Sequence, residues 1–437
     1  MSIGLLTVQL STGQKALPVT DATVEISRTS ETGQDTYLTT VSPDRSGNCP
    51  SVEIDAPPQE YSLQPQNAPQ PYSTYQVKIT APGFHTIQVT GIQTFAGENT
   101  LQQVHMLPLS FGETDSTVTY HIPEHLLRQP AALQQVSARP TRQAPDITPV
   151  VLRFPVIPEY VRVHLGRPDE EARNISVSFP EYIKNVTCSE IYPTWPENSL
   201  RANILAQISL VLNRVYTEWY PSRGYPFDIT NSTQYDQYFV EGRSIAENVS
   251  QLVDEMFNQY LKRPQYEEPF YAEYCNGTTV TCPGMSQWGT VELAEQGMSP
   301  LEILRYYYGD DLIINTARMG PGEVSSYPGR PLSYGRQGTD VLIIQQQLNR
   351  IAENYPAIPR ISNPNGIYLE STRSAVEAFQ EIFNLPVDGI VGMATWYQIS
   401  YIYVSVKKLA ELGSEGERPD SAAEGAYPGF PIQEGMS

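Results

Sequence analysis

The chain of 437 residues is poor in basic residues, in cysteine and in long hydrophobic runs. It has 28 Lys and Arg against 48 Asp and Glu, and the net charge of −20 excludes a basic face for nucleic acid or anionic lipid. No segment approaches the run of about 18 apolar residues that a membrane span needs. Four cysteines, at positions 49, 188, 275 and 282, are too few for a disulfide scaffold. The first residues lack the basic and apolar regions of a secretory signal, so we expect none.

These absences leave neutral polymers, held by hydrogen bonds and stacking, as the candidate ligands. The chain is rich in Tyr (28) and Pro (37), and surfaces with many aromatic rings suit carbohydrate. At about 100 to 200 residues per domain, the length predicts two to four domains.

Residues 1–110 consist of short runs in which apolar and polar residues alternate, separated by Gly, Pro, Asn and Asp. This pattern predicts an antiparallel β-sandwich. The stretch YQVKITAPGFHTIQVTGIQTFAGE resembles the carboxypeptidase regulatory-like, transthyretin-like modules, in which APGF turns between two strands. The resemblance implies a module without catalytic chemistry.

Residues 111–150 are rich in Pro, Gln, Ala and Arg and have no sustained periodicity, which predicts a protease-accessible linker. Arg128, Arg139 and Arg142 reverse the local charge in an otherwise acidic chain. Two interpretations remain open, a plain spacer or a segment that is processed. At the other end, residues 413–437 read as a flexible tail, although YPGFPI there repeats YPGRPL at 327–332.

Residues 327–412 contain two amphipathic helices and a third helix after a turn. The segment resembles the peptidoglycan-binding domain 1 family, a small three-helix bundle, through its signature D-G-x-x-G-x-x-T-W. The resemblance implies that this module binds the cell wall, and the matching residues are Asp388, Gly389, Gly392, Thr395 and Trp396.

Residues 151–317 predict an α+β domain. We expect strands in YVRVHLG and NISVSFPEYIKNVT, and a long helix after Pro196, where apolar residues recur at spacings of three and four from Leu200 to Trp219. Between them, Glu190 stands alone among Ile191, Tyr192, Pro193 and Trp195. An apolar setting disfavours the charged form of a carboxyl group and so favours an acid that is protonated near neutral pH. The alternative is a structural carboxylate at a helix end or in an ion pair with Arg201.

The segment SEIYPTWPENSLRANILAQ resembles the stage II sporulation protein D family, in which E-M-P, two residues, W-P and E-A-L-x-A-Q precede a helix. Glu190 matches the catalytic glutamate of that family, and Trp195 and Pro196 match its W-P. A second segment, GMSQWGTVELAEQGMSPLEILRYYYGDDLII, resembles the S-Q-[YW]-G motif and the tyrosine-rich tail of the family, with Ser286, Gln287 and Trp288 in the motif.

This sequence departs from that family in two ways. Ile191 and Tyr192 replace a single Met before the proline, which puts the loop geometry in doubt, and the Cys and His cluster that can hold zinc in the family has no counterpart in FDITNSTQYDQYF. We therefore predict no metal and no other cofactor.

The order of modules resembles the spore cortex-lytic enzymes of clostridia, the SleC group, in their pro-form. The resemblance implies a zymogen at the spore cortex or at the boundary between coat and cortex. It also implies two partners, cortex peptidoglycan and a subtilisin-like Csp germination protease that cuts within the linker, around Arg142 to Leu152. The implied activity is that of a lytic transglycosylase, in which Glu190 alone serves as acid and base.

Several alternatives stay open. A hydrolase would need a second carboxylate, for which Glu181, Glu197 and Asp228 are candidates. A non-catalytic wall-binding or amidase-enhancing protein would not need Glu190 at all. Tyr192, Trp195, Ser286, Gln287 and Trp288 are candidate sugar-binding residues, although the Gln-Trp pair equally suits a buried helix start. Cys275 and Cys282 flank a hairpin-like NGTTVT and are either disulfide-bonded or free.

Overall fold

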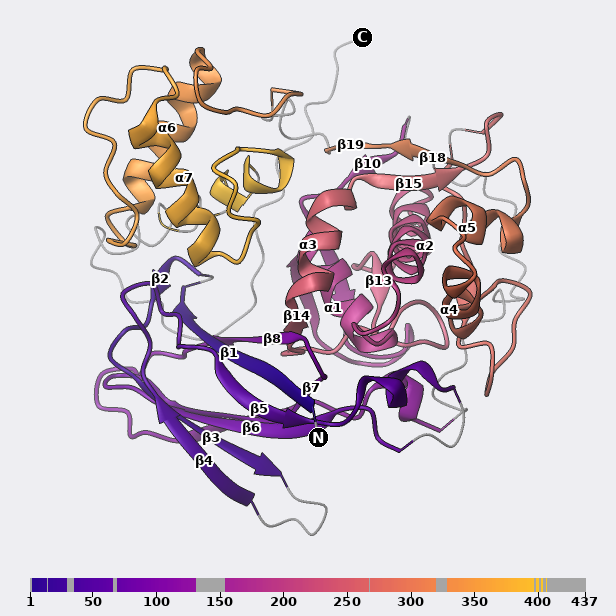
Figure 1. Cartoon of the computed structure of the whole chain (residues 1–437), viewed down its shortest axis with the longest axis horizontal. Helices are drawn as coiled ribbons and strands as arrows, with labels where there is room; N and C mark the ends of the chain where they lie inside the picture. Colours follow the sequence, from indigo (N-terminus) through magenta and orange to yellow (C-terminus); the bar gives the residue numbers. More distant parts are fainter. Residues whose placement is uncertain are drawn as a thin grey trace.

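The computed structural model describes residues 2–13, 15–29, 35–65, 69–130, 154–266, 268–319, 328–396, 398–400, 402–403 and 406. Figure 1 shows three parts, with the N-terminal strands in indigo and purple, the central α+β part in magenta and salmon, and the C-terminal helices in orange and yellow. The multidomain architecture and the sheet-rich N-terminal region are confirmed. Arg139, Arg142, Leu152 and the tail at 413–437 lie outside the described residues.

The N-terminal part is a sandwich of two sheets around one core. One sheet runs in the order β14-β8-β1-β2, with β5 also paired to β1, and the other runs β4-β3-β6-β7-β9. The strands are β1 (Ser2–Thr12), β2 (Leu17–Pro18), β3 (Thr23–Thr29), β4 (Asp35–Val41), β5 (Val52–Ala56), β6 (Ser73–Thr80), β7 (Thr86–Thr94), β8 (Asn99–His105), β9 (Thr117–His121) and β14 (Ile245–Ala246). Alternate residues such as Val8, Ile26 and Val77 point into this core.

Two predictions about this part need correction, and one strand pairing was not predicted. The sandwich is not wholly antiparallel, because β1 pairs parallel with β8 and β7 pairs parallel with β9. Alternation reports which face is buried and carries no information on strand direction. Part of the range predicted as linker is structured, since β9 and the short η2 helix (Leu126–Arg128) lie within 111–150. The sheet also crosses into the central part, because β14 pairs with β8.

The central part is α+β. Its helices are α1 (Phe179–Glu190), α2 (Glu197–Tyr216), α3 (Glu247–Met256), α4 (Gln287–Glu295) and α5 (Pro300–Tyr308). Its strands are β10 (Val156–Ile157), β11 (Tyr160–His164), β12 (Asn174–Ser178), β13 (Ile229–Thr230), β15 (Gln259–Lys262), β16 (Tyr274–Cys275), β17 (Met285–Ser286), β18 (Ile313–Thr316) and β19 (Arg318–Met319). They form small sheets, of which β12-β11-β13 is the largest in this part.

Helix α1 corrects the prediction of a strand over NISVSFPEYIKNVT. Only β12 is extended, and from Phe179 the chain is helical, with a proline in the first turn and a core-facing side that includes Tyr182, Ile183 and Val186. The β-branched residues favour a strand locally, but burial on two sides decides in favour of the helix. The long helix after Pro196 is confirmed as α2, which is buried over most of its circumference.

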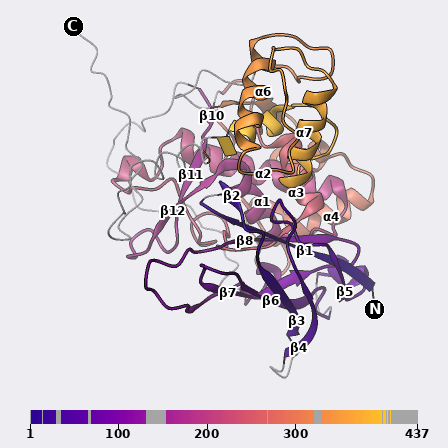
Figure 2. The same ribbon diagram turned by 90° about the vertical axis from the view of Figure 1, so that its left-hand side faces the viewer.

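The C-terminal part contains α6 (Thr339–Ile351) and α7 (Glu370–Ile382), and residues 393–396 and 398–400 are also helical. Figure 2 shows these helices above the β1–β2 end of the sandwich. Ala16 belongs to their hydrophobic core, and Gln9 donates a 2.6 Å hydrogen bond to the carbonyl of Ile382. Within the described residues, no helix is both long and apolar enough to cross a membrane.

Candidate active site

Glu190 is the last residue of α1, and the chain turns directly after it. Ile191 has an extended backbone and ends the helix, and α2 begins after the N-cap Pro196. The loop 191–196 therefore joins two helices that are both packed in the central core. Glu190 is only 2% exposed, so its carboxyl group lies inside the protein.

Three donors hold the Glu190 carboxyl group. Gln207 Nε2 and the Tyr274 hydroxyl donate to Oε2 over 2.9 and 2.7 Å, and the backbone N–H of Tyr238 donates to Oε1 over 2.8 Å. The donors come from α2, from β16 and from the loop before α3. The central part thus converges on this one side chain from three separate segments.

Burial raises the pKa of Glu190 to about 7, and the hydrogen bonds from Tyr238, Tyr274 and Gln207 oppose this shift. Desolvation penalises the charged form more strongly than the three donors stabilise it. The group therefore exchanges its proton near neutral pH, as a residue that acts in turn as acid and base must. An ordinary buried structural carboxylate would be paired with a cation, and Glu190 forms no ion pair within the described part of the chain.

Further hydrogen bonds fix the orientation of these donors. The Thr187 hydroxyl lies 2.7 Å from Gln207 Oε1 and 2.8 Å from the carbonyl of Ile183, and the Gln207 amide is oriented with its Nε2 toward Glu190. Gln237 Nε2 donates to the Tyr274 hydroxyl over 3.1 Å, which leaves the proton of that hydroxyl for Glu190. Tyr182 in turn donates to Gln237 Oε1 over 3.0 Å. All of these side chains are buried, and the network is pre-organised.

The alternative ion pair between Glu190 and Arg201 is wrong. Arg201 binds Glu197 over 2.7 Å and Glu255 over 2.6 Å. The other alternative, a carboxyl at a helix end, describes the position of Glu190 correctly. The negative end of the helix dipole also disfavours a charged carboxylate there, so this position acts in the same direction as burial, which is the largest cause of the raised pKa of Glu190.

The candidates for a second carboxylate are all engaged by cations. Asp228 binds Arg162 over 2.6 Å, Glu197 binds Arg201, and Glu181 lies 3.7 Å from Lys184. None of the three is among the hydrogen-bond partners of Glu190. The choice between a single acid and a pair of carboxylates therefore stays a prediction.

The predicted aromatic residues come together into one cluster. The rings of Trp195 and Trp288 are 4.8 Å apart, and Tyr192 lies 6.1 Å from each of them. All three side chains are buried: Trp195 and Tyr192 are 3% exposed, and Trp288 is 6% exposed. They form a buried aromatic cluster in the core of the central part, and their stacking on sugar stays a prediction.

Ser286 and Gln287 form a helix start. The Ser286 hydroxyl accepts a 2.9 Å hydrogen bond from the N–H of Gly289 as the N-cap of α4, and Gln287 is 2% exposed. The buried helix-start interpretation therefore describes their packing. Binding of sugar by these two residues remains a prediction, and buried Gln287 Nε2, which has no hydrogen-bond partner among the described atoms, is a donor it would use.

Cys275 and Cys282 are disulfide-bonded, which decides between the two alternatives for them. Tyr274 directly precedes this disulfide, and β16 pairs with β17, which leads into α4. The disulfide loop is thus attached to a donor of Glu190 on one side and to the S-Q-W-G motif on the other.

Residues of the N-terminal part lie against the loop that follows Glu190. His125 Nε2 lies 3.2 Å from the carbonyl of Ile191, Gln129 donates to the Tyr238 hydroxyl over 2.8 Å, and Trp195 Nε1 donates to the carbonyl of Ser62 over 2.9 Å. His125 is fully buried, and burial first and Arg243 second hold its pKa well below the usual range. The segment before the predicted cutting zone therefore packs against the loop that follows Glu190 and against Tyr238.

The signature residues of the C-terminal module organise its fold. Gln380 Nε2 donates to Asp388 Oδ1 over 2.8 Å, and Gln380 Oε1 accepts from the N–H of Gly389 over 2.9 Å. Gly389 has a positive φ of 65°, and Trp396 is 1% exposed. The predicted contact of the signature residues, Gly392 and Thr395 included, with the wall stays a prediction.

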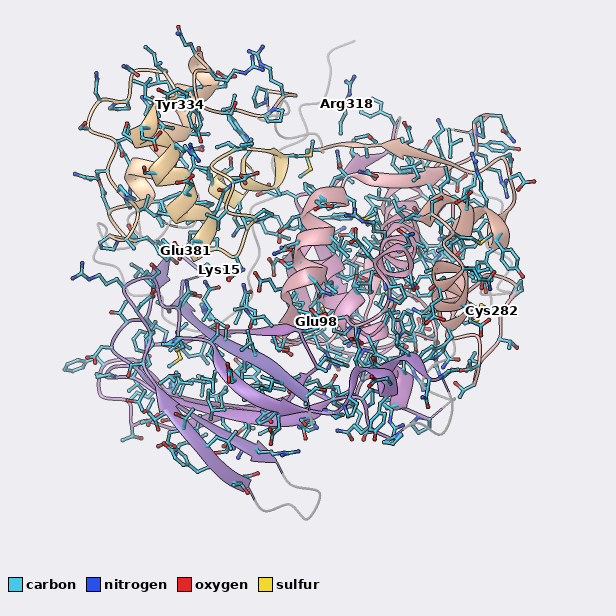
Figure 3. The ribbon with its side chains drawn as sticks, viewed as in Figure 1. Lys15, Glu98, Cys282, Arg318, Tyr334 and Glu381 are labelled. Atoms are coloured by element: carbon cyan, nitrogen blue, oxygen red, sulfur yellow. A yellow bond between two sulfur atoms is a disulfide. The ribbon has the colours of Figure 1, made fainter. Side chains whose placement is uncertain are left out.

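Gln207 is the last residue of the segment SEIYPTWPENSLRANILAQ that resembles the family motif, whereas nothing in the sequence indicated Tyr274, Tyr238 or His125. Tyr274 and Tyr238 contribute a hydroxyl and a backbone N–H from segments that match no motif. Their sequence neighbours give no signal, because only the fold brings them to Glu190. Figure 3 shows how densely side chains fill this central part.

The described residues contain no group of three or more His, Cys, Asp or Glu side chains that could hold a metal ion.

Comparison with known proteins identifies the C-terminal part. Residues 337–399 match the family model described as "Putative peptidoglycan binding domain". A module of the peptidoglycan-binding kind is present. The match lies within the range 327–412 predicted for it, and it makes this a peptidoglycan-related protein with peptidoglycan as its partner.

The other comparisons are with whole curated proteins and with solved structures. No curated protein matches the chain. The crystal structure of the SleB N-terminal domain is similar to 18% of this chain over 97% of its own length, at 27% identity and a TM-score of 0.16. Transthyretin from Sparus aurata is similar to 24% of this chain over 90% of its own length, at 17% identity and a TM-score of 0.17.

Proposed function

We propose that the chain is the pro-form of a lytic transglycosylase of spore cortex peptidoglycan. The observation that carries the proposal is Glu190, a single buried carboxyl whose pKa is raised to about 7 and which three oriented donors hold. It supports the proposal because the same residue also matches the catalytic position of the sporulation D motif. The C-terminal module supplies the attachment to the wall.

In the proposed reaction, Glu190 donates its proton to the oxygen that joins N-acetylmuramic acid to N-acetylglucosamine. The bond between this oxygen and muramic C1 breaks, the muramic C6 hydroxyl attacks C1, and its proton passes to the Glu190 carboxylate. The products are a 1,6-anhydromuramic end and a glucosamine end with a free hydroxyl, and no water is consumed. A second carboxylate is unnecessary, because the nucleophile belongs to the substrate.

The zymogen part of the proposal rests on the covering of this site. Glu190 is 2% exposed, so a glycosidic oxygen cannot reach it in the full-length chain. The covering segment that includes His125 and Gln129 precedes the predicted cut between Arg142 and Leu152 in the chain. A cut there, made by a subtilisin-like germination protease, would separate the cover from the central part and let it dissociate.

The test compares the intact chain with a chain that carries an inserted protease site within 142–152 and is cut after folding. Both are incubated with cortex peptidoglycan, and the products are identified by mass spectrometry. We expect anhydro ends from the cut chain and at least about tenfold fewer from the intact one. Reducing ends without anhydro ends would indicate a hydrolase. Intact glycan with retained wall binding would instead support the alternative, a non-catalytic binding or amidase-enhancing protein.

A further inference from the structure

Arg243 is a buried guanidinium group that has no counter-charge within the part of the chain that the structure describes. It is 5% exposed, its Nε donates to the Ser189 hydroxyl over 3.2 Å, and its Nη2 donates to the carbonyl of Pro123 over 3.4 Å. Both partners are neutral. Nη1 is buried and has no hydrogen-bond partner among the residues that the structure describes. A charged group in this state is strongly destabilising unless something neutralises it.

The acidic and basic groups around Arg243 leave its charge unpaired. The guanidinium forms no ion pair with any described carboxylate, and burial lowers its pKa to about 10, which still leaves it charged at neutral pH. The groups that act on it include Cys188, whose pKa burial raises to about 12, and Tyr72, whose pKa burial also raises, so both are neutral at pH 7. His125, also close to Arg243, is held neutral.

Arg243 is one of the residues that line a small cavity. Arg243 and Ser244 line it from the central part and Gln93 and Thr100 from the sandwich, and all four are at most 5% exposed. The Thr100 hydroxyl makes only a long bond of 3.4 Å, to the carbonyl of Gln93. The cavity leaves about 10 Å³ for the centre of a water-sized sphere, which matches one water molecule or one ion of similar size.

We propose that this cavity is a binding site for a small monovalent inorganic anion of halide size, at the junction of the sandwich and the central part. Nη1 of Arg243 supplies the charge and the hydroxyls of Thr100 and Ser244 supply hydrogen bonds. A water molecule would satisfy Nη1 but leave the charge uncompensated, and a carboxylate or phosphate group is too large for the space. Because the ligands come from both sides, the anion stabilises the association of the two parts.

The test uses the full-length chain and chloride as the probe. Thermal unfolding is followed at constant ionic strength while chloride replaces gluconate, which is too large to enter. We expect a saturable rise in Tm of about 2–4 °C. The rise is abolished in Arg243→Gln and reduced in Ser244→Ala, but retained in Arg373→Gln, in which an exposed arginine of the C-terminal module is changed. Ser244→Ala keeps the test decisive if Arg243→Gln does not fold.

Crystals soaked in bromide provide the second measurement. The proposal predicts an anomalous peak within hydrogen-bonding distance of Arg243 Nη1. A Tm that does not depend on chloride overturns the proposal. In that case a water molecule in the cavity, or a bromide bound there, would show an empty site or an adventitious ion only, present at crystal concentration.

Discussion

At the scale of the residue, Glu190 is a carboxyl group on which burial and hydrogen bonding act in opposite directions. Burial raises its pKa, and the donors Gln207, Tyr274 and Tyr238 lower it. Such a balance near neutral pH has a cost for the folded state, because the protein must bury a charge whenever the proton is lost. Both the stability and the activity of the chain should therefore report this one pKa.

Glu190→Gln should make the protein more stable at neutral pH. The pKa of Glu190 is raised from 4.5 to about 7 in the folded protein. The contribution of this group to the free energy of unfolding is therefore fully present below pH 4.5 and is lost as the pH rises through 7. The loss corresponds to about 3 kcal/mol in the free energy of unfolding. Glu98, whose pKa is also raised to about 7, contributes a loss to both proteins. Urea unfolding at pH 4.5 and pH 8 should therefore show a loss that is larger in the wild type than in the variant by about 3 kcal/mol. An equal loss in both would contradict the raised pKa.

Tyr274→Phe should shift the pH profile of catalysis. The variant loses a hydrogen bond that lowers the pKa of Glu190, so the pKa rises further and the alkaline limb of the rate profile moves to higher pH by about 0.5 to 1 unit. The rate of anhydro-product formation by the cut chain against pH provides the measurement. Tyr306→Phe, at a side chain that is 66% exposed, is the matched control. An unchanged limb would show that Tyr274 does not act on Glu190.

At the scale of the element, the start of α4 depends on a close approach to α5. A Cβ atom built on Gly289 would lie 2.0 Å from the Tyr307 hydroxyl and 3.1 Å from Ser286. The glycine of the S-Q-W-G motif is thus a packing requirement. The motif residues fix how α4 sits against α5.

Gly289→Ala should destabilise the protein by about 1–3 kcal/mol, because the Tyr307 ring must move to admit the methyl group. Gly392→Ala is the control, since nothing lies within 4 Å of its built Cβ. Denaturant unfolding of the full-length chain, followed by tryptophan fluorescence, gives the difference. Equal stability of the two variants would contradict this account of the motif.

The elements that sequence reasoning predicted are those in which one signal dominates. The 3.6-residue period after Pro196 predicted α2, and the APGF turn predicted the β6–β7 hairpin, in which Gly83 has a positive φ of 78°. Helix α1 was missed because Ile, Val and Thr in its sequence favour a strand while its packing favours a helix. Strand β14 was missed because two residues carry no pattern, and only the exposed edge of β8 gives them a partner.

The candidate site was predictable for its carboxylate and not for the partners of that carboxylate. Glu190 stands in a recognisable motif, and its apolar neighbours already indicated a raised pKa. Tyr274 and Tyr238 are contributed by segments 84 and 48 positions away in the sequence. Their contact with Glu190 depends on long-range packing, which no local pattern encodes.

At the scale of the whole molecule, the sandwich is attached to both of the other parts. It covers the loop after Glu190 through His125 and Ser62. On its other side it holds the peptidoglycan-binding module, where the Tyr355 hydroxyl donates to the carbonyl of Lys15 over 2.5 Å. Removal of the sandwich would free the candidate active site and the wall-binding module together.

Release of the sandwich from a cut chain should be more complete in acid. His125 is buried and neutral, with its pKa held well below 6.5. The contribution of His125 to the association of the sandwich with the central part is therefore present above about pH 6.5. It is lost as the pH falls below this value, because the imidazole binds a proton in the released form and not in the buried one. Gel filtration of the cut chain between pH 7.5 and 5.5 measures the dissociated fraction. His125→Gln should show a weaker dependence on pH, and an unchanged dependence would contradict the role of His125.

The most direct test of the central claim is the yield of 1,6-anhydromuramic ends from cortex peptidoglycan treated with the cut chain. We predict that Glu190→Gln lowers this yield by at least about 100-fold. Its binding to the wall should stay intact, and the Glu197→Gln control should retain its activity. Anhydro ends formed at an undiminished rate by Glu190→Gln would contradict the assignment of Glu190 as the acid and base.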